Sequence, residues 1–522
     1  MRKQFLIWGI VISIYGLRLL TYPQDDLALK KLVSDSTHKN FVLTVKEEPS
    51  SKNGFLTIKA KLTEVCGDLD LPESNQKSVG VSAQESCEKI KSHSFVQTRI
   101  FEKTIQAELE KSDHQILEVG DRIIVTGTVH TLIKSGTEIN AGKSAENLSP
   151  EELAKLKKEK SFQNYLRKER IFYEVKIQKI QQLEKPPHFI FVRALIRLRK
   201  SIEESIRNSM PSPESDLAQG LVISGKGSMS PELLKDFTRV GLVHIVVLSG
   251  SNVSIISAAL FAMLKNLPYF LKVSLGILSM AGFAIMTGGS PPVTRSVLMS
   301  SLPLLWRIIK KRSDEQEKIE SGEVQEPVKS LTKKLSMYQE RDSPLILLFA
   351  TGMCMSLYNP LLPIYDISFQ LSFMATLGLM VLTEPFAKLL SFIPEKFSIR
   401  EIVSSSLATQ VYVLPLLLTI SDEVSTVFLV ANIIVLPILP LVMLLIGVVS
   451  FTRFMIPDVS GVAASVSWFF LHYIIEIVVY LSNLGYATFS LYTLSLTQVG
   501  VIYSVVILLA FQANKILQKC NK

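Results

Sequence analysis

The sequence has few of the residues that build metal sites or redox centres. It contains only four cysteines in 522 residues, of which Cys66 and Cys87 lie in a polar N-terminal region and Cys354 and Cys520 lie in or beside apolar runs. There is no Cys-x-x-Cys pair and no His/Cys cluster with zinc-ligand spacing, so we expect no metal ion and no other cofactor. The sequence also lacks a P-loop, so any ATP-driven step would have to come from a partner.

Charge of one sign is in modest excess, and its placement is informative. The formal net charge is +9, and much of the excess lies in short segments next to apolar runs. This placement follows the positive-inside rule for cytoplasmic loops, and it outweighs an interpretation as a nucleic-acid-binding surface. The residues concerned are Arg307, Lys310, Lys311, Arg312, Lys388, Lys396, Lys515, Lys519 and Lys522.

Long apolar runs dominate the second half of the chain, each near the ~20 residues that a membrane-crossing helix needs. They fall at 242–264, 268–288, 292–309, 344–358, 361–383, 402–421, 424–451, 462–484 and 490–512. Together with an uncleaved N-terminal anchor at 1–21, they predict a polytopic α-helical membrane protein with about ten transmembrane helices.

The polar region at 35–185 reads as an extracytoplasmic domain that follows the first helix. Strand-like segments with alternating apolar residues are expected at 41–45, 55–65, 100–109, 121–133 and 172–180, with a glycine kink at Gly127 and a helix capped by Ser149. This pattern predicts a five-stranded β-barrel of the OB-fold type. If the domain faces an oxidising compartment, Cys66 and Cys87 can pair as a disulfide; two free thiols are the alternative.

Helices are expected between the two parts, over 189–240. The helix at 189–210 is amphipathic, with five basic residues among Leu and Ile. It fits either a helix on the membrane surface or a linker helix packed on the barrel. A second helix is predicted to start with Ser230 as its cap and Pro231 in its first turn.

Polar residues inside the apolar runs mark the candidate site, because polar groups in a bilayer are costly. The alternatives are helix–helix packing for the small residues and snorkelling for Arg295. We expect Asp366 to form a structural ion pair with Arg295, and Pro437 and Pro440 to break a helix near Asn432. The channel-lining candidates are His244, Ser249, Gly250, Asn252, Arg295, Gln370, Ser372 and Asn432.

An intramembrane hydrolase built on Ser249 and His244 is a weaker alternative. Their i, i+5 spacing places the side chains about 140° apart on a straight helix. Neither a Gly-x-Ser-Gly setting nor a third orienting group is evident.

Several of these clusters, in this order, resemble the ComEC family of competence proteins. The run 217–253 is similar to the start of the family's membrane domain, and 295–299 resembles its Arg-Ala-x-x-Met element. Asn359-Pro360 followed by 367–373 is similar to its Asn-Pro and Phe-Gln-Leu-Ser-Phe pair, and 162–171 resembles an element before the last barrel strand. One departure is Ser249-Gly250-Ser251-Asn252-Val253, where the family commonly has Ser-Gly-Leu-His-Val, so the histidine's role transfers only weakly to Asn252.

The resemblance implies transport of single-stranded DNA across the inner membrane during natural transformation, by a channel domain at 241–514 that is not an enzyme. It also implies a DNA-receptor protein outside, and a cytoplasmic ATPase or single-strand-binding proteins inside. Many members carry a metallo-β-lactamase-like domain, but no His-x-His-x-Asp-His motif occurs here. Strand degradation would therefore need a separate nuclease. A transporter of another polymer or metabolite is the alternative function.

Overall fold

The chain divides into two compact units. The first contains Met1–Leu195 and Ser356–Asp366, and the second contains Ile196–Met355 and Ile367–Lys522. The computed structural model describes residues 39–47, 50–52, 55–66, 103–110, 118–119, 121–131, 159, 163–164, 166, 173–184, 189–246, 250–264, 266–305, 343–394, 398–421, 423–455, 460–491, 494–495, 497–506 and 508. The predicted anchor at 1–21 and the helix that Ser149 would cap lie outside these residues.

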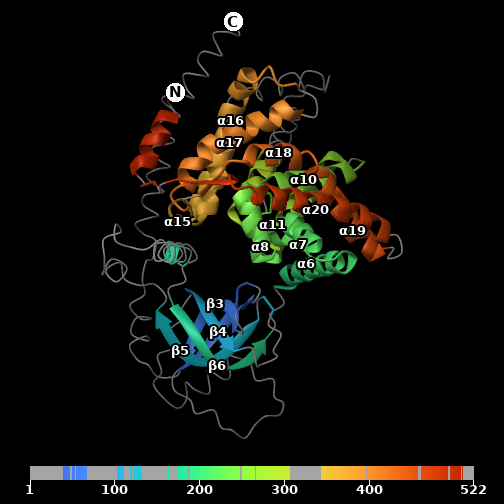
Figure 1. Ribbon diagram of the computed structural model, residues 1–522. Helices are drawn as coiled ribbons and strands as arrows, with labels where there is room; N and C mark the ends of the chain where they lie inside the picture. The colour runs from blue at the N-terminus through green and yellow to red at the C-terminus, as the bar shows by residue number, and fades with distance from the viewer. Residues whose placement is uncertain are drawn as a thin grey trace, which may run out of the picture. The chain divides into compact units, whose positions relative to one another are not determined.

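The first unit is built on one sheet of six strands (Figure 1). The strands are β1 (Lys39–Val45), β2 (Ser50–Lys52), β3 (Phe55–Cys66), β4 (Lys103–Glu110), β5 (Arg122–Thr131) and β6 (Tyr173–Glu184). Their order is β1-β5-β6-β4-β3-β2, and β1 also pairs with β3, so five strands close into a ring. β4 and β6 run parallel, and the other described pairs run antiparallel. Each of the five predicted strand segments overlaps one strand of the ring.

Alternation along the strands supplies the interior of the ring. Phe41, Leu43 and Val45 of β1 are buried, and Phe41 and Leu43 lie opposite Val125 and Ile123 of β5. Because successive side chains of a strand point to opposite faces, this spacing of two places one apolar set inside. The predicted glycine kink coincides with a shift in the β5–β6 register between Thr126 and Gly127.

A buried ion pair ties the start of helix α6 (Ile190–Ser209) to the turn before β5 within the first unit. Arg193 Nη2 donates to Asp121 Oδ1 at 2.9 Å, and Arg193 Nε donates to the Val119 carbonyl at 2.9 Å. The backbone N–H of Glu118 donates to the other carboxylate oxygen of Asp121 at 2.8 Å. The described residues therefore show the first turn of this amphipathic helix attached to the turn before β5.

The second unit is helical. It contains α6 from Ile196 onward. Its other described helices are α7 (Glu214–Gln219), the π-helix η3 (Gly220–Ser224), the 3-10 helix η4 (Gly225–Ser228), α8 (Pro231–Val240), α9 (Val243–Val246), α10 (Gly250–Met263), α11 (Tyr269–Met286), a helix at 291–305, α14 (Ser343–Tyr358, whose last residues belong to the first unit), α16 (Ile367–Leu389), α17 (Ile399–Leu417), α18 (Phe428–Val435), α19 (Leu439–Met455), α20 (Ser460–Ser482) and a helix at 497–506. Two short strands, β7 (Glu423–Ser425) and β8 (Thr488–Ser490), pair antiparallel. The short helix α15 (Leu362–Tyr365) belongs to the first unit.

Some helices of this unit are long and apolar enough to cross a membrane. Among the described residues, Ile367–Leu389 and Gly461–Ser482 are long and apolar enough to span a bilayer. The pair Phe428–Val435 and Leu439–Arg453, bent by 50°, makes a third if it forms one span. The chain is thus a membrane protein, and the total of about ten crossings stays a prediction.

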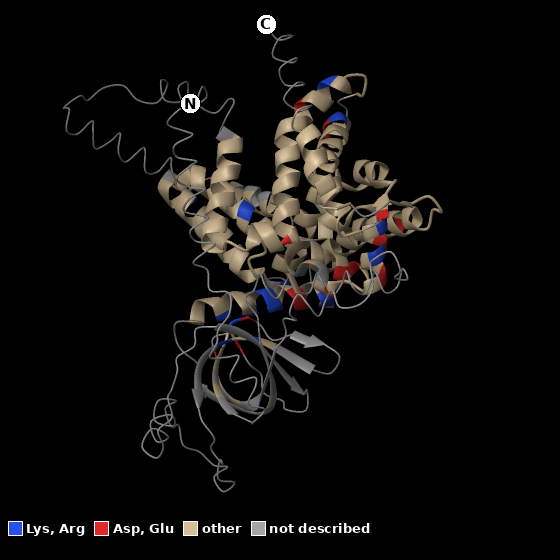
Figure 2. Cartoon of the chain, turned by 90° about the vertical axis from the view of Figure 1, so that its left-hand side faces the viewer, with Lys and Arg blue, Asp and Glu red and all other residues tan. Residues whose placement is uncertain are grey.

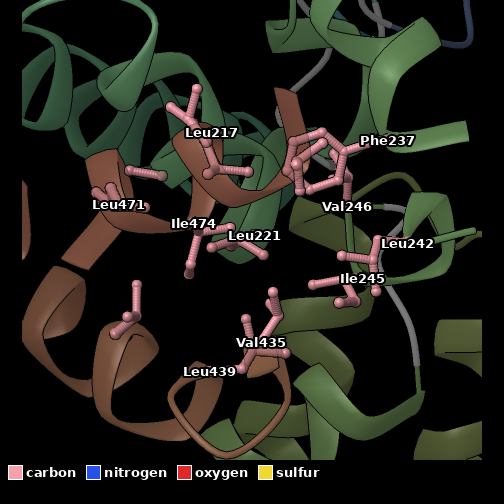
Figure 3. Close-up of a cluster of buried hydrophobic side chains, with 14 of the residues drawn as sticks. Leu217, Leu221, Phe237, Leu242, Ile245, Val246, Val435, Leu439, Leu471 and Ile474 are labelled. Carbon is pink, nitrogen blue, oxygen red and sulfur yellow. The ribbon is translucent and has the colours of Figure 1, made fainter. Parts of the chain in front are cut away.

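The main core of the second unit gathers helices that are far apart in the sequence. Figure 3 shows buried side chains from α7, η3, α8, α9, α18, α19 and α20 turned toward one another. They include Leu217, Leu221, Phe237, Leu242, Ile245, Val246, Val435, Leu439, Leu471 and Ile474. Most of these helices are too short to span a bilayer alone, so this core holds broken segments in place.

Candidate functional site in the helical unit

The segment from α7 to α10 changes direction several times, and its sequence explains where. Ser230 caps α8, with its Oγ accepting from the Leu233 N–H, and Pro231 occupies the first turn as predicted. Gly241 ends α8 with a φ of 83°, a left-handed conformation that glycine adopts without a Cβ clash. A Cβ there would lie 2.9 Å from the Cβ of Phe428. The chain therefore turns at Gly241 and packs closely against α18.

Asn252 connects two of the broken segments. Its side chain is buried, and Nδ2 donates to the Leu221 carbonyl of η3 at 3.0 Å and to the Ile245 carbonyl of α9 at 3.4 Å. Carbonyls at helix ends and in π-turns lack regular helical partners, so a side-chain amide is well suited to satisfy them. Asn252 thus holds the irregular backbone together, and its predicted place on a DNA path stays a prediction.

The other predicted residues of this first cluster are only partly described. His244 is exposed, and its Nδ1 lies 3.0 Å from the Gly241 carbonyl. Gly250 begins α10. Ser249 lies outside the described residues, so the structure does not test its pairing with His244.

Arg295 and Ser372 come from separate predicted clusters, and the structure brings them together. Arg295, in the helix at 291–305, donates from Nε to Ser372 Oγ of α16 at 2.8 Å. Its Nη1 lies 3.4 Å from Met299 Sδ. Among the described residues of the second unit, the Arg295 guanidinium has no carboxylate partner. A guanidinium half-buried in a helical membrane unit is costly unless it faces water, protein or an anion.

The predicted ion pair of Arg295 with Asp366 stays a prediction, because the two residues belong to different compact units. Asp366 is buried and follows the short helix α15. Gln370 lies one turn further along, in α16.

Asn432 lies one turn before a break that the two prolines cause. α18 ends at Val435 and α19 begins at Leu439, so the predicted break at Pro437 is confirmed. Pro437 has no N–H to continue the helical hydrogen bonds. Asn432 is buried, and its Nδ2 donates to Ser406 Oγ at 3.0 Å. In the described part of the chain, its Oδ1 has no hydrogen-bond partner.

Several buried hydroxyls share this property with Asn432, and three of them belong to residues that are buried as a whole. The side chains of Ser257, Thr351 and Ser404 are buried and make no hydrogen bond among the described residues. Such groups are rare in folded proteins and usually contact ordered water or a ligand. They lie on α10, α14 and α17, so polar atoms without partners are spread over several helices of this unit.

Sequence reasoning missed two contacts that join the α7–α8 segment to α20. His472 Nδ1 lies 2.8 Å from Glu214 Oε1 of α7, and Ser482 Oγ donates to Asp236 Oδ1 of α8 at 2.9 Å. The available signal was the pair of titratable residues His472 and Glu476, one turn apart inside the apolar run 462–484. Figure 2 shows how few charged residues interrupt the helices.

Comparison with known proteins now identifies the family. The model of the family described as "Competence protein" matches residues 221–316 and 330–515, which is more than half of the chain. The chain belongs to the Competence protein family. The match covers α8, Arg295, Ser372 and Asn432, so the candidate site lies inside the region that defines the family.

One curated protein that is similar to this chain is the "ComE operon protein 3" of Bacillus subtilis (strain 168). It is 24% identical to this chain over 283 residues, which cover 53% of this chain and 31% of that protein. The aligned part is therefore about a third of the relative's length. No solved structure matches the chain.

Proposed function

We propose that this Competence-family chain passes single-stranded DNA through the inner membrane during natural transformation, as a conduit rather than an enzyme. Membership in the family supports the connection with competence. The observation that carries the proposal is the Arg295 guanidinium, which lies half-buried in the helical unit and donates to the Ser372 hydroxyl at 2.8 Å. A guanidinium matches the geometry of a phosphate oxygen pair, which every nucleotide of the cargo offers.

Broken helices support a polar path. Irregular backbone at membrane depth is tolerated where it is buried in protein or lines a water-filled cavity. The π-helix η3, the turn at Gly241 and the bend between α18 and α19 provide such backbone. Transport proteins commonly place their binding sites at discontinuous helices of this kind.

The closed sheet of the first unit supports the OB-fold proposal. Its cyclic order β1-β3-β4-β6-β5, with β4 parallel to β6, is compatible with a small Greek-key barrel that binds oligonucleotides in other proteins. We place this domain on the extracytoplasmic side, where it would receive DNA from a receptor protein. A cytoplasmic ATPase or single-strand-binding proteins would take up the strand, and a separate nuclease would remove its complement.

The test uses Arg295→Ala, Arg295→Lys and the matched control Arg453→Ala. Arg453 is exposed in the last turn of α19. At equal membrane levels of each variant, uptake of labelled DNA into the cytoplasm is measured together with transformation frequency. Loss of one charged hydrogen bond to phosphate lowers both by about 10- to 100-fold for Arg295→Ala. Arg295→Lys restores part of the DNA uptake and of the transformation frequency. Lysine keeps the positive charge but lacks the planar guanidinium, which can donate two parallel hydrogen bonds.

Normal DNA uptake by Arg295→Ala contradicts the proposed role of this residue. Normal transformation after deletion of the whole gene contradicts the function. A growth defect that depends on a particular nutrient, with transformation intact, favours a metabolite or polymer transporter instead.

A further inference from the structure

Two titratable residues on α20 lie inside a helix that is long enough to cross a membrane. His472 and Glu476 are one turn apart, within the candidate span Gly461–Ser482. Ionisable side chains are rare in membrane spans because their charged forms lose hydration, and where they occur they have a partner and a function. The DNA path proposed above uses neither residue.

A buried carboxylate from another helix meets His472 directly. Glu214 lies in the first turn of α7, and its Oε1 is 2.8 Å from His472 Nδ1. The Glu214 side chain is 5% exposed, whereas that of His472 is 45% exposed. The imidazole also stacks on Trp468, with ring centroids 4.8 Å apart and an interplanar angle of 13°. The ring is therefore fixed in position, with one nitrogen turned toward the buried carboxylate.

The contact has a direction when Glu214 is ionised. An ionised carboxylate can only accept hydrogen bonds, so in that state Nδ1 of His472 carries the hydrogen of the 2.8 Å contact and donates it to Glu214. In the neutral ring, Nε2 then holds the free lone pair. Nε2 is 4.0 Å from Oε1 of Glu476, whose side chain is 67% exposed. A proton that arrives from the exposed side binds to the Nε2 lone pair and gives an imidazolium. The negative charge of an ionised Glu214 balances the positive charge of this ring.

The surroundings supply few competing charges. α7, α8, α18 and α19 pack against α20. α18 has no titratable residue, and the charge on α19 is Arg453 in its last turn. On α7, Asp216 accepts from Ser212. On α8, Asp236 accepts from Ser482, and the remaining charged residues are Glu232, Lys235 and Arg239.

We propose that His472 is a proton-binding site of the membrane unit, with Glu214 as its buried counter-ion and Glu476 as the carboxylate on its exposed side. The bound species is the proton. Because Glu214 begins α7, the same hydrogen bond fastens the broken segment 214–240 to α20, so the protonation state of this pair bears on that attachment. The proposal concerns the site alone and does not depend on the cargo.

Nitrogen NMR of the full-length protein in lipid nanodiscs tests the site. The protein is labelled with ¹⁵N-histidine, and His472→Gln identifies the His472 signals among those of the seven histidines. Spectra are recorded from about pH 8 to about pH 5. We expect the hydrogen on Nδ1 wherever the ring is neutral, and the second proton on Nε2 wherever the ring is charged. Glu214→Ala removes the acceptor and changes the tautomer ratio at least about tenfold toward Nε2–H, whereas Glu476→Ala leaves Nδ1–H dominant.

Three results overturn the proposal. They are an Nε2–H tautomer in the wild type, a His472 signal that does not change over this pH range, and an unchanged tautomer ratio in Glu214→Ala. If Glu214→Ala fails to insert, Glu214→Gln replaces it: the amide keeps an acceptor, so Nδ1–H persists while its chemical shift moves. An unmoved shift in that variant counts against the counter-ion. None of these readouts requires DNA, so they are separate from the proposed transport.

Discussion

Replacing Asp121 by alanine is expected to destabilise the barrel unit strongly. Asp121 is fully buried, accepts from Arg193 and from the Glu118 N–H, and lies in the turn that starts β5. Its removal takes the closest carboxylate away from the largely buried Arg193 guanidinium and leaves Glu118, whose Oε2 lies 3.9 Å from Arg193 Nε. Breaking a buried pair in this way costs about 3–5 kcal/mol of unfolding free energy. Since a domain of this kind is stable by about 5–15 kcal/mol, the loss is a third or more of the total in most cases.

A double-mutant cycle separates this effect from a simple loss of packing. The cycle consists of Asp121→Leu, Arg193→Met and the double replacement that combines these two, with Asp121→Ala measured beside them. Because apolar residues of similar volume often replace a buried pair at little cost, the double variant is expected within about 1 kcal/mol of the wild type. Asp121→Asn serves as the control that keeps hydrogen-bonding atoms without the charge.

The measurement is protease resistance of the barrel unit in the full-length, membrane-inserted protein across a urea series. We expect the urea concentration at half-loss of protease resistance to be lower for both single variants of the cycle than for the wild type. In the double variant, we expect it to return close to the wild-type value. Single variants that lose less than about 1 kcal/mol, or a double variant whose loss equals the sum of the singles, refute the reasoning.

Three further substitutions test the packing of the helical unit, each by thermal unfolding of the purified protein in detergent. Gly378→Ala places a Cβ 2.5 Å from the Ala408 carbonyl oxygen, so α16 and α17 must move apart. We expect a loss of about 1–3 kcal/mol of unfolding free energy. An unchanged melting temperature contradicts the close approach of the two helices. Gly241→Ala forces an alanine into a left-handed backbone conformation and places its Cβ 2.9 Å from the Cβ of Phe428. We expect a loss of at least about 1–2 kcal/mol of unfolding free energy. The control Gly227→Ala has open space around the added Cβ, so it is not expected to show this loss. Asn252→Leu leaves two buried carbonyls without their donor, at a cost of about 1–3 kcal/mol; wild-type stability would show that neither bond matters.

Local features were predictable because they depend on neighbouring residues. The caps at Ser230 and Pro231, the break at Pro437 and the register shift at Gly127 follow from the backbone preferences of single residues. The strands of the first unit follow from alternation of apolar residues. Even the order of the polar clusters was enough to indicate the family that the comparison then showed.

Side-chain partners were harder to predict. Arg295 was expected to be a candidate lining residue, and hydropathy shows that a guanidinium in an apolar run needs a partner. Hydropathy does not show which residue that is, and within its unit the structure supplies Ser372. Similarly, Asn252 was expected to line a path, but its amide satisfies carbonyls of two segments that precede it in the chain.

The sequence by itself determined that the chain enters a membrane, that a strand-rich polar region precedes the apolar half, and where several helices begin and break. These properties depend on hydropathy and on local backbone chemistry. Only the tertiary structure decided that Glu214 meets His472 across 258 positions, and that β4 pairs in parallel with β6. Such contacts depend on how distant segments pack, and packing is a property of the whole fold that no single stretch of sequence contains.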